Sequence, residues 1–229
     1  GAYNTNFQSI TGSHPTYAAD APDRSLYYVN ISDYLAYLDW SGLRPMTELE
    51  YEKATRGTRS PTPDEFAWGD VTIHASAYTL TNPGLANETV NAVATNGNAS
   101  YSTTDGPLNR PLRVGSIAAS QATPNRVEAG ATYYGIMEMS GNQWEYTVPV
   151  GRAEGRIFDG SHGEGSITAA GIHDVTNWTT TIYGIGIRGG SYNDASTQLR
   201  TSSRQYAHYN STGFTRVAQY NGRGVRTAQ

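Results

Sequence analysis

The sequence predicts an α+β domain, and two observations support this. Two helix-forming segments lie close together early in the chain. Short apolar stretches, separated by clusters of Gly, Asn and Asp, follow from residue 132 onward. Helices and strands that occupy separate parts of a sequence are typical of α+β folds. The 229 residues show no internal repeat and are enough for one domain with a sizeable core.

Capping residues predict where both helices begin and end. The first helix is expected to begin near Ser32, next to an aspartate that can cap it, and to end at Trp40 before a Ser-Gly pair. The second is expected to begin at Thr47, with Glu50 three residues further on as in a capping box, and to close at Gly57. The other acidic residues of this second helix suit its positive N-terminal end.

The rest of the chain is expected to form loops and short strands. Residues 1–28 are polar and irregular, which predicts an N-terminal arm or loop ahead of a domain at residues 29–229. Residues 58–130 are rich in Gly, Pro, Asn and Thr, which predicts long loops, and long loops in one domain often carry function or a bound ion. Strands are expected at residues 133–139, 144–150, 180–187 and 223–227.

The composition excludes several classes of function. The chain has no cysteine, which rules out a thiol nucleophile, a cysteine-ligated zinc ion and an iron–sulfur cluster. Its net charge of −4 provides no basic field for nucleic acid, and no apolar stretch approaches the roughly 20 residues that cross a membrane. The balance of many Ser, Thr, Asn and Tyr residues with a single Lys favours an extracellular, cell-surface or virion protein.

One short segment could hold a cation. Residues 138–145 (EMSGNQWE) offer two carboxylates, side-chain amides and flexible backbone, and calcium prefers oxygen ligands of these kinds. The alternative is a β-turn with its apex at Gly141 and Asn142 and with Trp144 in the core. The five histidines are scattered, and no G-x-S-x-G motif is present, so the residues indicate no catalytic group.

Several ordered blocks of the sequence are similar to motifs of one known family. Residues 29–52 (VNISDYLAYLDWSGLRPMTELEYE) are similar to VSWxDAxAYCxWxGxRLPTEAEWE, and residues 134–147 (YGIMEMSGNQWEYT) to FGLYDMxGNVWEWT. The shorter blocks are ATRG at 54–57, FAWGD at 66–70, RGGSY at 188–192, LRTSSR at 199–204 and RGVR at 223–226. From about residue 29 onward, the chain therefore resembles the formylglycine-generating enzyme family, also called the sulfatase-modifying-factor domain. The resemblance implies a variant of the C-type-lectin fold.

Two departures from the family bear on function. Its oxidising members use two cysteines, just after the GGS turn, to hold copper and the substrate cysteine. The matching stretch here, Tyr192–Leu199, has no thiol, so we expect no formylglycine-generating activity. The family's opening segment is not found in this sequence. We expect either that the chain is part of a longer protein or that an assembly partner supplies this segment.

Calcium is the one cofactor that the resemblance implies. In the family, a calcium ion lies in the GNVWEW turn and is ligated by alternating side-chain and backbone oxygens. The matching metal ligands here would be Glu138, Gly141, Gln143 and Glu145.

The resemblance also implies a place for ligand binding. One branch of the fold consists of the variable proteins of diversity-generating retroelements, in which a lectin-like C-terminal segment displays varied residues. Tyr and Asn suit such adaptable binding surfaces. The candidate ligand-binding residues in this segment are Tyr192, Asn193, Asp194, Tyr206, His208 and Tyr209. Four arginines at family motif positions are expected to be structural: Arg188, Arg200, Arg204 and Arg226.

Three functions are compatible with the sequence. We favour a non-catalytic, C-type-lectin-like domain that binds a protein or glycan partner through its C-terminal loops, without nucleic-acid binding or membrane insertion. The first alternative is a structural subunit of a surface, secretion, gliding or virion assembly. The second is an enzyme that uses the same fold with a thiol-free mechanism.

Overall fold

The computed structural model describes residues 24–92, 95–105, 108–208 and 211–227. Helix α1 spans Ile31–Trp40, and its N-cap is Asn30, whose side chain accepts a hydrogen bond from the backbone N–H of Asp33. The cap therefore lies two residues before the predicted Ser32, because Asn30 and Asp33 form a reciprocal capping box. Most of the predicted N-terminal arm, residues 1–23, lies outside the described residues.

The structure confirms the predicted start and end of helix α2. It spans Glu48–Arg56, the Thr47 side chain caps it, and the Glu50 side chain accepts a hydrogen bond from the Thr47 backbone N–H at 2.9 Å. Gly57 ends the helix with a φ of +66°, a conformation that glycine adopts without steric cost.

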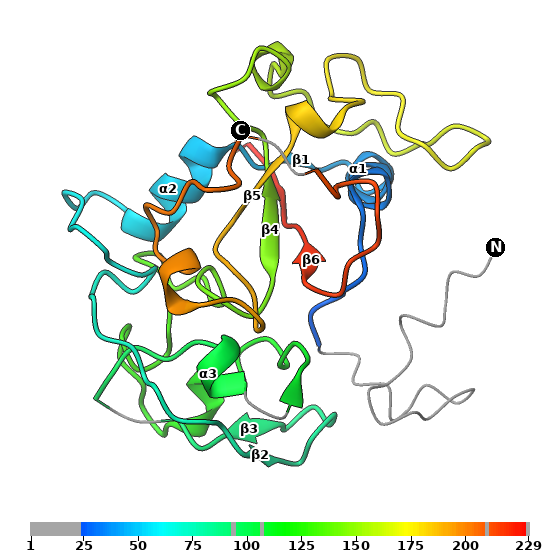
Figure 1. Ribbon diagram of the computed structural model, residues 1–229. Coiled ribbons are helices and arrows are strands. Elements are labelled where there is room, and N and C mark those ends of the chain that lie inside the picture. Colours follow the sequence, from blue (N-terminus) through cyan, green and yellow to red (C-terminus); the bar gives the residue numbers. More distant parts are fainter. Residues whose placement is uncertain (1–23, 93–94, 106–107, 209–210, 228–229) are drawn as a thin grey trace.

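The centre of the molecule is a three-stranded sheet in the order β5-β4-β6. Strand β4 (Trp144–Thr147) pairs antiparallel with β5 (Gly186–Arg188) and parallel with β6 (Tyr220–Asn221). Beside this sheet, β1 (Arg44–Pro45) pairs antiparallel with β7 (Gly224–Val225). In Figure 1, α1 and α2 lie on either side of β4.

A loop-rich lobe holds the other two described strands, β2 (Leu80–Thr81) and β3 (Thr89–Val90), and the short helix α3 (Ser102–Asp105) (Figure 1). The two strands pair as a two-stranded hairpin. The described 3₁₀ turns are η3 (Ala118–Ser120) in this lobe and, elsewhere, η4 (Gly155–Ile157), η5 (Ile182–Gly184) and η6 (Ser196–Gln198). The lobe agrees with the long loops expected at residues 58–130.

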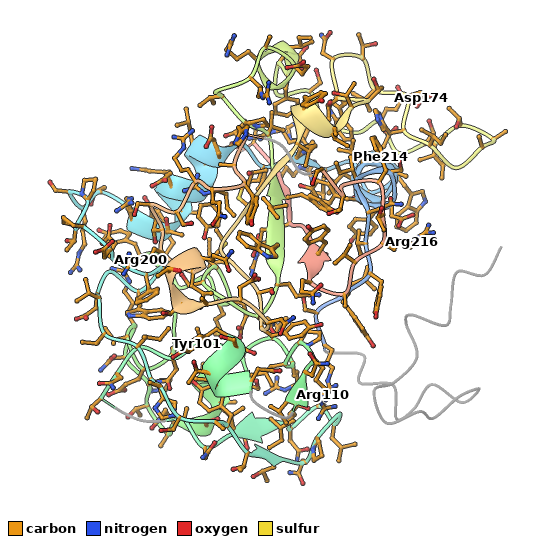
Figure 2. The ribbon with its side chains drawn as sticks, in the orientation of Figure 1. Tyr101, Arg110, Asp174, Arg200, Phe214 and Arg216 are labelled. Carbon is orange, nitrogen blue, oxygen red and sulfur yellow. The ribbon has the colours of Figure 1, made fainter. Side chains whose placement is uncertain are left out.

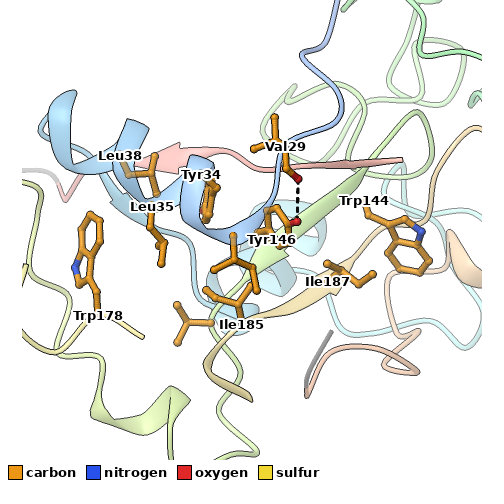
Figure 3. Close-up of a cluster of buried hydrophobic side chains, with 11 residues drawn as sticks. Val29, Tyr34, Leu35, Leu38, Trp144, Tyr146, Trp178, Ile185 and Ile187 are labelled. Atoms are coloured by element: carbon orange, nitrogen blue, oxygen red, sulfur yellow. Dashed lines mark hydrogen bonds between the residues drawn. The ribbon is translucent and has the colours of Figure 1, made fainter. Parts of the chain in front are cut away.

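The main core lies between α1 and the central sheet (Figure 3). α1 buries Tyr34 and Leu38 in the same cluster as Tyr146 of β4 and Ile185. The buried hydroxyl of Tyr146 donates a 2.9 Å hydrogen bond to the carbonyl oxygen of Val29, drawn as a dashed line in Figure 3. This bond satisfies the polar end of the ring inside an apolar core.

Several strand predictions are wrong in extent. Residues 133–139 form no strand, because the Thr132 side chain and backbone close a turn with Ile136 and Gly135 adopts a φ of +78°. The predicted strands at 144–150, 180–187 and 223–227 shorten to β4, β5 and β7. Within the described residues, no helix is long and apolar enough to cross a membrane.

Candidate functional site

A pocket of about 320 Å³ opens beside the central sheet, and we call it the C-terminal pocket. Most of its lining residues follow Arg188 in the chain. They come from the turn after β5 and from the segment that leads into β6, while β4 and β5 each contribute one residue. The described lining residues are Trp144, Ile187, Asn193, Asp194, Tyr206, Ser211, Thr212, Gln219 and Tyr220.

Aromatic side chains form much of this pocket. The rings of Trp144 and Tyr206 meet edge to face, with centroids 5.6 Å apart. Trp144 is 5% exposed and lies at the end of the main core next to Ile187 (Figure 3), whereas Tyr206 is 38% exposed. The hydroxyls of Tyr220 and Thr212 are hydrogen-bonded at 2.9 Å. The pocket therefore has a rigid aromatic side that is continuous with the core.

Asp194 is the single carboxylate among the described lining residues. It is half-buried, and its carboxylate accepts hydrogen bonds from the backbone N–H and the hydroxyl of Ser191. Burial raises the pKa of Asp194, and hydrogen bonds from Ser191 and from the Trp144 side chain partly offset this rise. All of these donors are neutral, so no protein cation balances the charge of Asp194 within this group of contacts.

The structure brings three of the predicted ligand-binding residues together, because Asn193, Asp194 and Tyr206 all line the C-terminal pocket. The expectation that Tyr192 is a surface residue is wrong. Its side chain is 3% exposed, and its backbone N–H donates to the carbonyl oxygen of Asn142, which holds it inside the turn.

The other two predicted ligand-binding residues lie elsewhere. His208 is exposed but is not among the lining residues of the pocket, and Tyr209 lies outside the described residues. Sequence reasoning missed Trp144, which lines the pocket together with Tyr220. They meet because β4 pairs in parallel with β6, with Trp144 opposite Tyr220. No local pattern signals this pairing across 76 residues of sequence separation.

The predicted calcium turn borders a second pocket of about 260 Å³, which we call the acidic cavity. Glu138, Gln143 and Glu145 line it, whereas Gly141 is not among its described lining residues. Gly141 adopts a φ of +86°, and a Cβ at this position would lie 2.3 Å from the carbonyl oxygen of Ser100. The glycine is therefore required by close backbone packing.

Two buried carboxylates share this cavity with one guanidinium. Arg223 Nε donates to Glu145 Oε1 at 2.5 Å, while buried Glu145 Oε2 has no hydrogen-bond partner among the described residues. Glu138 Oε1 accepts a hydrogen bond from the backbone N–H of Gly115 at 3.3 Å. Burial raises the pKa of Glu145 and raises that of Glu138 to about 7.

The acidic cavity meets some of the requirements of a calcium site. Two carboxylates, one with an unpaired oxygen, and the amide oxygen of Gln143 fit calcium in ligand type. The described residues contain no group of three or more His, Cys, Asp and Glu side chains that could hold a metal ion. A calcium ion here would therefore also depend on backbone and amide oxygens, and Arg223 would compete with it for Glu145.

A third polar cluster, the Arg188 network, lies on the other side of β5 around the fully buried side chain of Arg188. Arg188 donates to Glu48 at 3.3 Å, to Glu52 at 2.5 Å and to the carbonyl oxygen of Thr201 at 2.6 Å. Arg204 also pairs with Glu48, at 2.7 Å. These contacts tie α2 to β5 and the following turns, as expected for structural arginines.

The comparisons with known proteins agree with the motifs. The family model described as "Sulfatase-modifying factor enzyme 1-like domain" matches residues 4–228, which is nearly the whole chain. No curated protein matches the chain. The family match begins at residue 4, whereas the similar motifs begin at residue 29.

Proposed function

Since the chain belongs to the sulfatase-modifying factor enzyme 1-like domain family and has the C-type-lectin-like fold of that family, we propose that it is a binding domain and not a cysteine oxidase. The stretch Tyr192–Leu199, where the resemblance places the two cysteines of oxidising members, contains no thiol. Copper–thiolate chemistry therefore has no ligand in this chain. What remains of the family's properties is the scaffold and its loops.

The C-terminal pocket is the observation that carries this proposal. Binding pockets are concave and largely preformed, and they combine apolar and aromatic walls with a few well-placed polar groups. This pocket has Trp144, Tyr206 and Tyr220 on its aromatic side, and hydroxyls, amides and one carboxylate around them. Tyr and Asn supply contact area and adaptable hydrogen bonding at low entropic cost. The proposed partner is a protein or a glycan outside the cell.

Substitution of Tyr206 tests the proposal. The purified chain would be screened on glycan and peptide arrays, and the affinity of each captured ligand would then be measured by calorimetry. Tyr206→Ala should weaken binding by about 1–4 kcal/mol, as the loss of an interface anchor does. The matched control is Tyr134→Ala, which removes a 53% exposed ring that does not line the pocket. Equal affinity of the Tyr206 variant and the wild type would refute the proposal.

We further infer that a calcium ion stabilises the acidic cavity. The supporting observation is the buried Oε2 atom of Glu145, which lacks a hydrogen-bond partner among the described residues although it lies in a cavity shared with Glu138. An unpaired buried carboxylate oxygen is costly, and a bound cation would remove that cost. Calcium would act here on stability and loop order, with no role in chemistry.

A further inference from the structure

We propose that the C-terminal pocket recognises a primary ammonium group, of the kind carried by a lysine side chain or an amino sugar. This inference rests on the proposed binding function and names the class of ligand. Three features of the pocket support it: its charge, its aromatic rings and its hydrogen-bond acceptors.

The charge of the pocket is negative and uncompensated. Among its nine described lining residues, Asp194 is the one carboxylate and none is Lys, Arg or His. The arginines of the surrounding segment are engaged with carboxylates outside the pocket: Arg200 with Asp64, Arg204 with Glu48, Arg216 with Asp33 and Arg223 with Glu145. Arg216, labelled in Figure 2, donates two hydrogen bonds to the Asp33 carboxylate in the first turn of α1.

The environment of Asp194 favours a cation as the missing partner. Its carboxylate accepts hydrogen bonds from Ser191 and the Trp144 side chain, which are neutral, and half-burial disfavours its ionised form. An ammonium ion at hydrogen-bond distance would stabilise the carboxylate strongly, because charge-assisted hydrogen bonds gain strength as water is excluded. An anionic ligand would instead be repelled by the same group.

Aromatic rings suit the apolar and cationic parts of such a ligand. Tyr206 and Tyr220 line the pocket with Trp144, and aromatic rings attract cations through their negative faces. The remaining walls carry side-chain oxygens of Asn193, Thr212 and Gln219. A primary ammonium has three N–H donors for such oxygens, whereas a quaternary ammonium has none, so the wall composition favours the primary amine.

Tryptophan resonances can report binding directly. The chain has four tryptophans, so ¹⁵N-tryptophan labelling gives few indole signals, and a Trp144→Phe variant identifies the one from the pocket. Two pairs of probes are used, and in each pair one compound carries an ammonium group and the other is neutral at that position. The pairs are Nα-acetyl-lysine methylamide with Nα-acetyl-norleucine methylamide, and glucosamine with N-acetylglucosamine. We expect the Trp144 signal to shift with the amines at concentrations tenfold below those at which the neutral analogues act. Tighter binding of the lysine derivative than of glucosamine would indicate a peptide as the source of the ammonium group, and the reverse would indicate a glycan.

Substitution of Asp194 provides the second arm. Asp194→Asn should reduce the amine affinity at least tenfold and abolish the preference over the neutral analogue. Asp174→Asn, an exposed aspartate outside the pocket, should change neither. A melting curve for each variant would show that the fold is retained.

Two outcomes would overturn the inference. Equal shifts with amines and neutral analogues would show that the pocket selects shape without charge, and the binding function would stand. The absence of any shift would exclude amines as ligands. In that case, the array experiment with Tyr206→Ala decides independently whether the pocket binds a partner at all.

Discussion

The two sides of β5 place charged residues in opposite situations. Arg188 points into the Arg188 network, where it contacts two carboxylates and a carbonyl oxygen and is fully buried. The preceding residue, Ile187, lines the C-terminal pocket together with Asp194, whose carboxylate accepts hydrogen bonds from the neutral backbone N–H and hydroxyl of Ser191. Successive residues of a strand face opposite sides of the sheet, so one short strand separates the two environments.

This difference separates the scaffold from the proposed binding surface. Where charges are enclosed and mutually compensated, as around Arg188, removal of one partner leaves another buried and unpaired, and the cost appears in stability. Where a charge faces an open pocket without a counter-ion, as at Asp194, its removal should appear mainly in binding. Charge compensation is therefore the feature that separates the two clusters: the carboxylates of the Arg188 network are paired with arginines, and Asp194 has neutral hydrogen-bond donors.

The largest expected effect comes from breaking the Arg188 network. Arg188→Met should lower the free energy of unfolding by about 3–5 kcal/mol, the usual cost of breaking a buried ion pair. The substitution leaves the Thr201 carbonyl without its donor and Glu48 with the partly exposed Arg204 alone as its cationic partner. Urea denaturation measures the change. A loss below about 1 kcal/mol would show that the network is not a stabilising part of the scaffold.

Calcium removal is expected to have the next largest effect. If the acidic cavity holds calcium, saturation at 100 times the dissociation constant stabilises the fold by about 2.7 kcal/mol, and EDTA should lower the melting temperature accordingly. Glu138→Gln should abolish the response to EDTA, because the Glu145–Arg223 pair alone offers a single carboxylate. Glu145→Ala should abolish it as well.

The matched control for calcium is Glu164→Gln, an exposed glutamate outside the acidic cavity, which should melt like the wild type in EDTA. A melting curve of the wild type that does not change with EDTA, together with the absence of copurified metal, would contradict the calcium proposal. Arg223 would then be the sole cation of the cavity.

The pH dependence of stability provides a smaller test inside the loop-rich lobe. Burial raises the pKa of Asp105 from 3.8 to about 7, although backbone amides partly oppose the shift. The folded state therefore holds this proton more tightly than the unfolded state. The contribution of Asp105 is most favourable below about pH 4 and is lost as the pH rises toward 7.

Asp105→Asn should remove this decline. The variant should gain stability relative to the wild type between pH 4 and pH 7.5, as measured by urea denaturation at both values. An identical pH profile for the two proteins would show that Asp105 is solvated or neutralised by another group in the folded state.

The smallest expected effect belongs to an exposed ion pair. Arg200 and Asp64 lie 2.8 Å apart, with side chains that are 36% and 59% exposed. Arg200→Met should change the free energy of unfolding by less than about 1 kcal/mol, because solvent and salt screen such pairs. This variant also serves as the control for Arg188→Met, since both remove an arginine at a family motif position. A loss as large as that of Arg188→Met would contradict the distinction between the two environments.

The sequence predicted the parts of the fold that depend on neighbouring residues. Both helices were predicted, and the capping box of Thr47 and Glu50 placed α2 to the residue. The predicted start of α1 was slightly too late, because the N-cap is Asn30 and not Ser32. Family motifs identified the fold class, but β6 and β1 are two-residue strands without any periodicity, so local patterns could not reveal them.

The candidate site was also predicted only where its residues are close together in the sequence. Asn193, Asp194 and Tyr206 were identified from one continuous segment and line one pocket. Tyr192 was misplaced because the turn after β5 directs its ring into the interior. The aromatic wall of Trp144 depends on strand pairing between distant segments, which only the folded structure provides.

The pairing of β7 with β1 has a consequence for how the molecule is made. Arg44 pairs with Val225, which joins an early and a late part of the chain, and Trp144 pairs with Tyr220, which joins the middle of the chain to the same late part. Proteins dominated by such distant pairings fold slowly, because long loops must close before their contacts form. During synthesis, neither ladder can form until Tyr220–Val225 has left the ribosome. Until then, the edge of β4 that pairs with β6 has no hydrogen-bonding partner strand. The nascent chain should therefore be most vulnerable to aggregation, and most dependent on chaperones, at this stage.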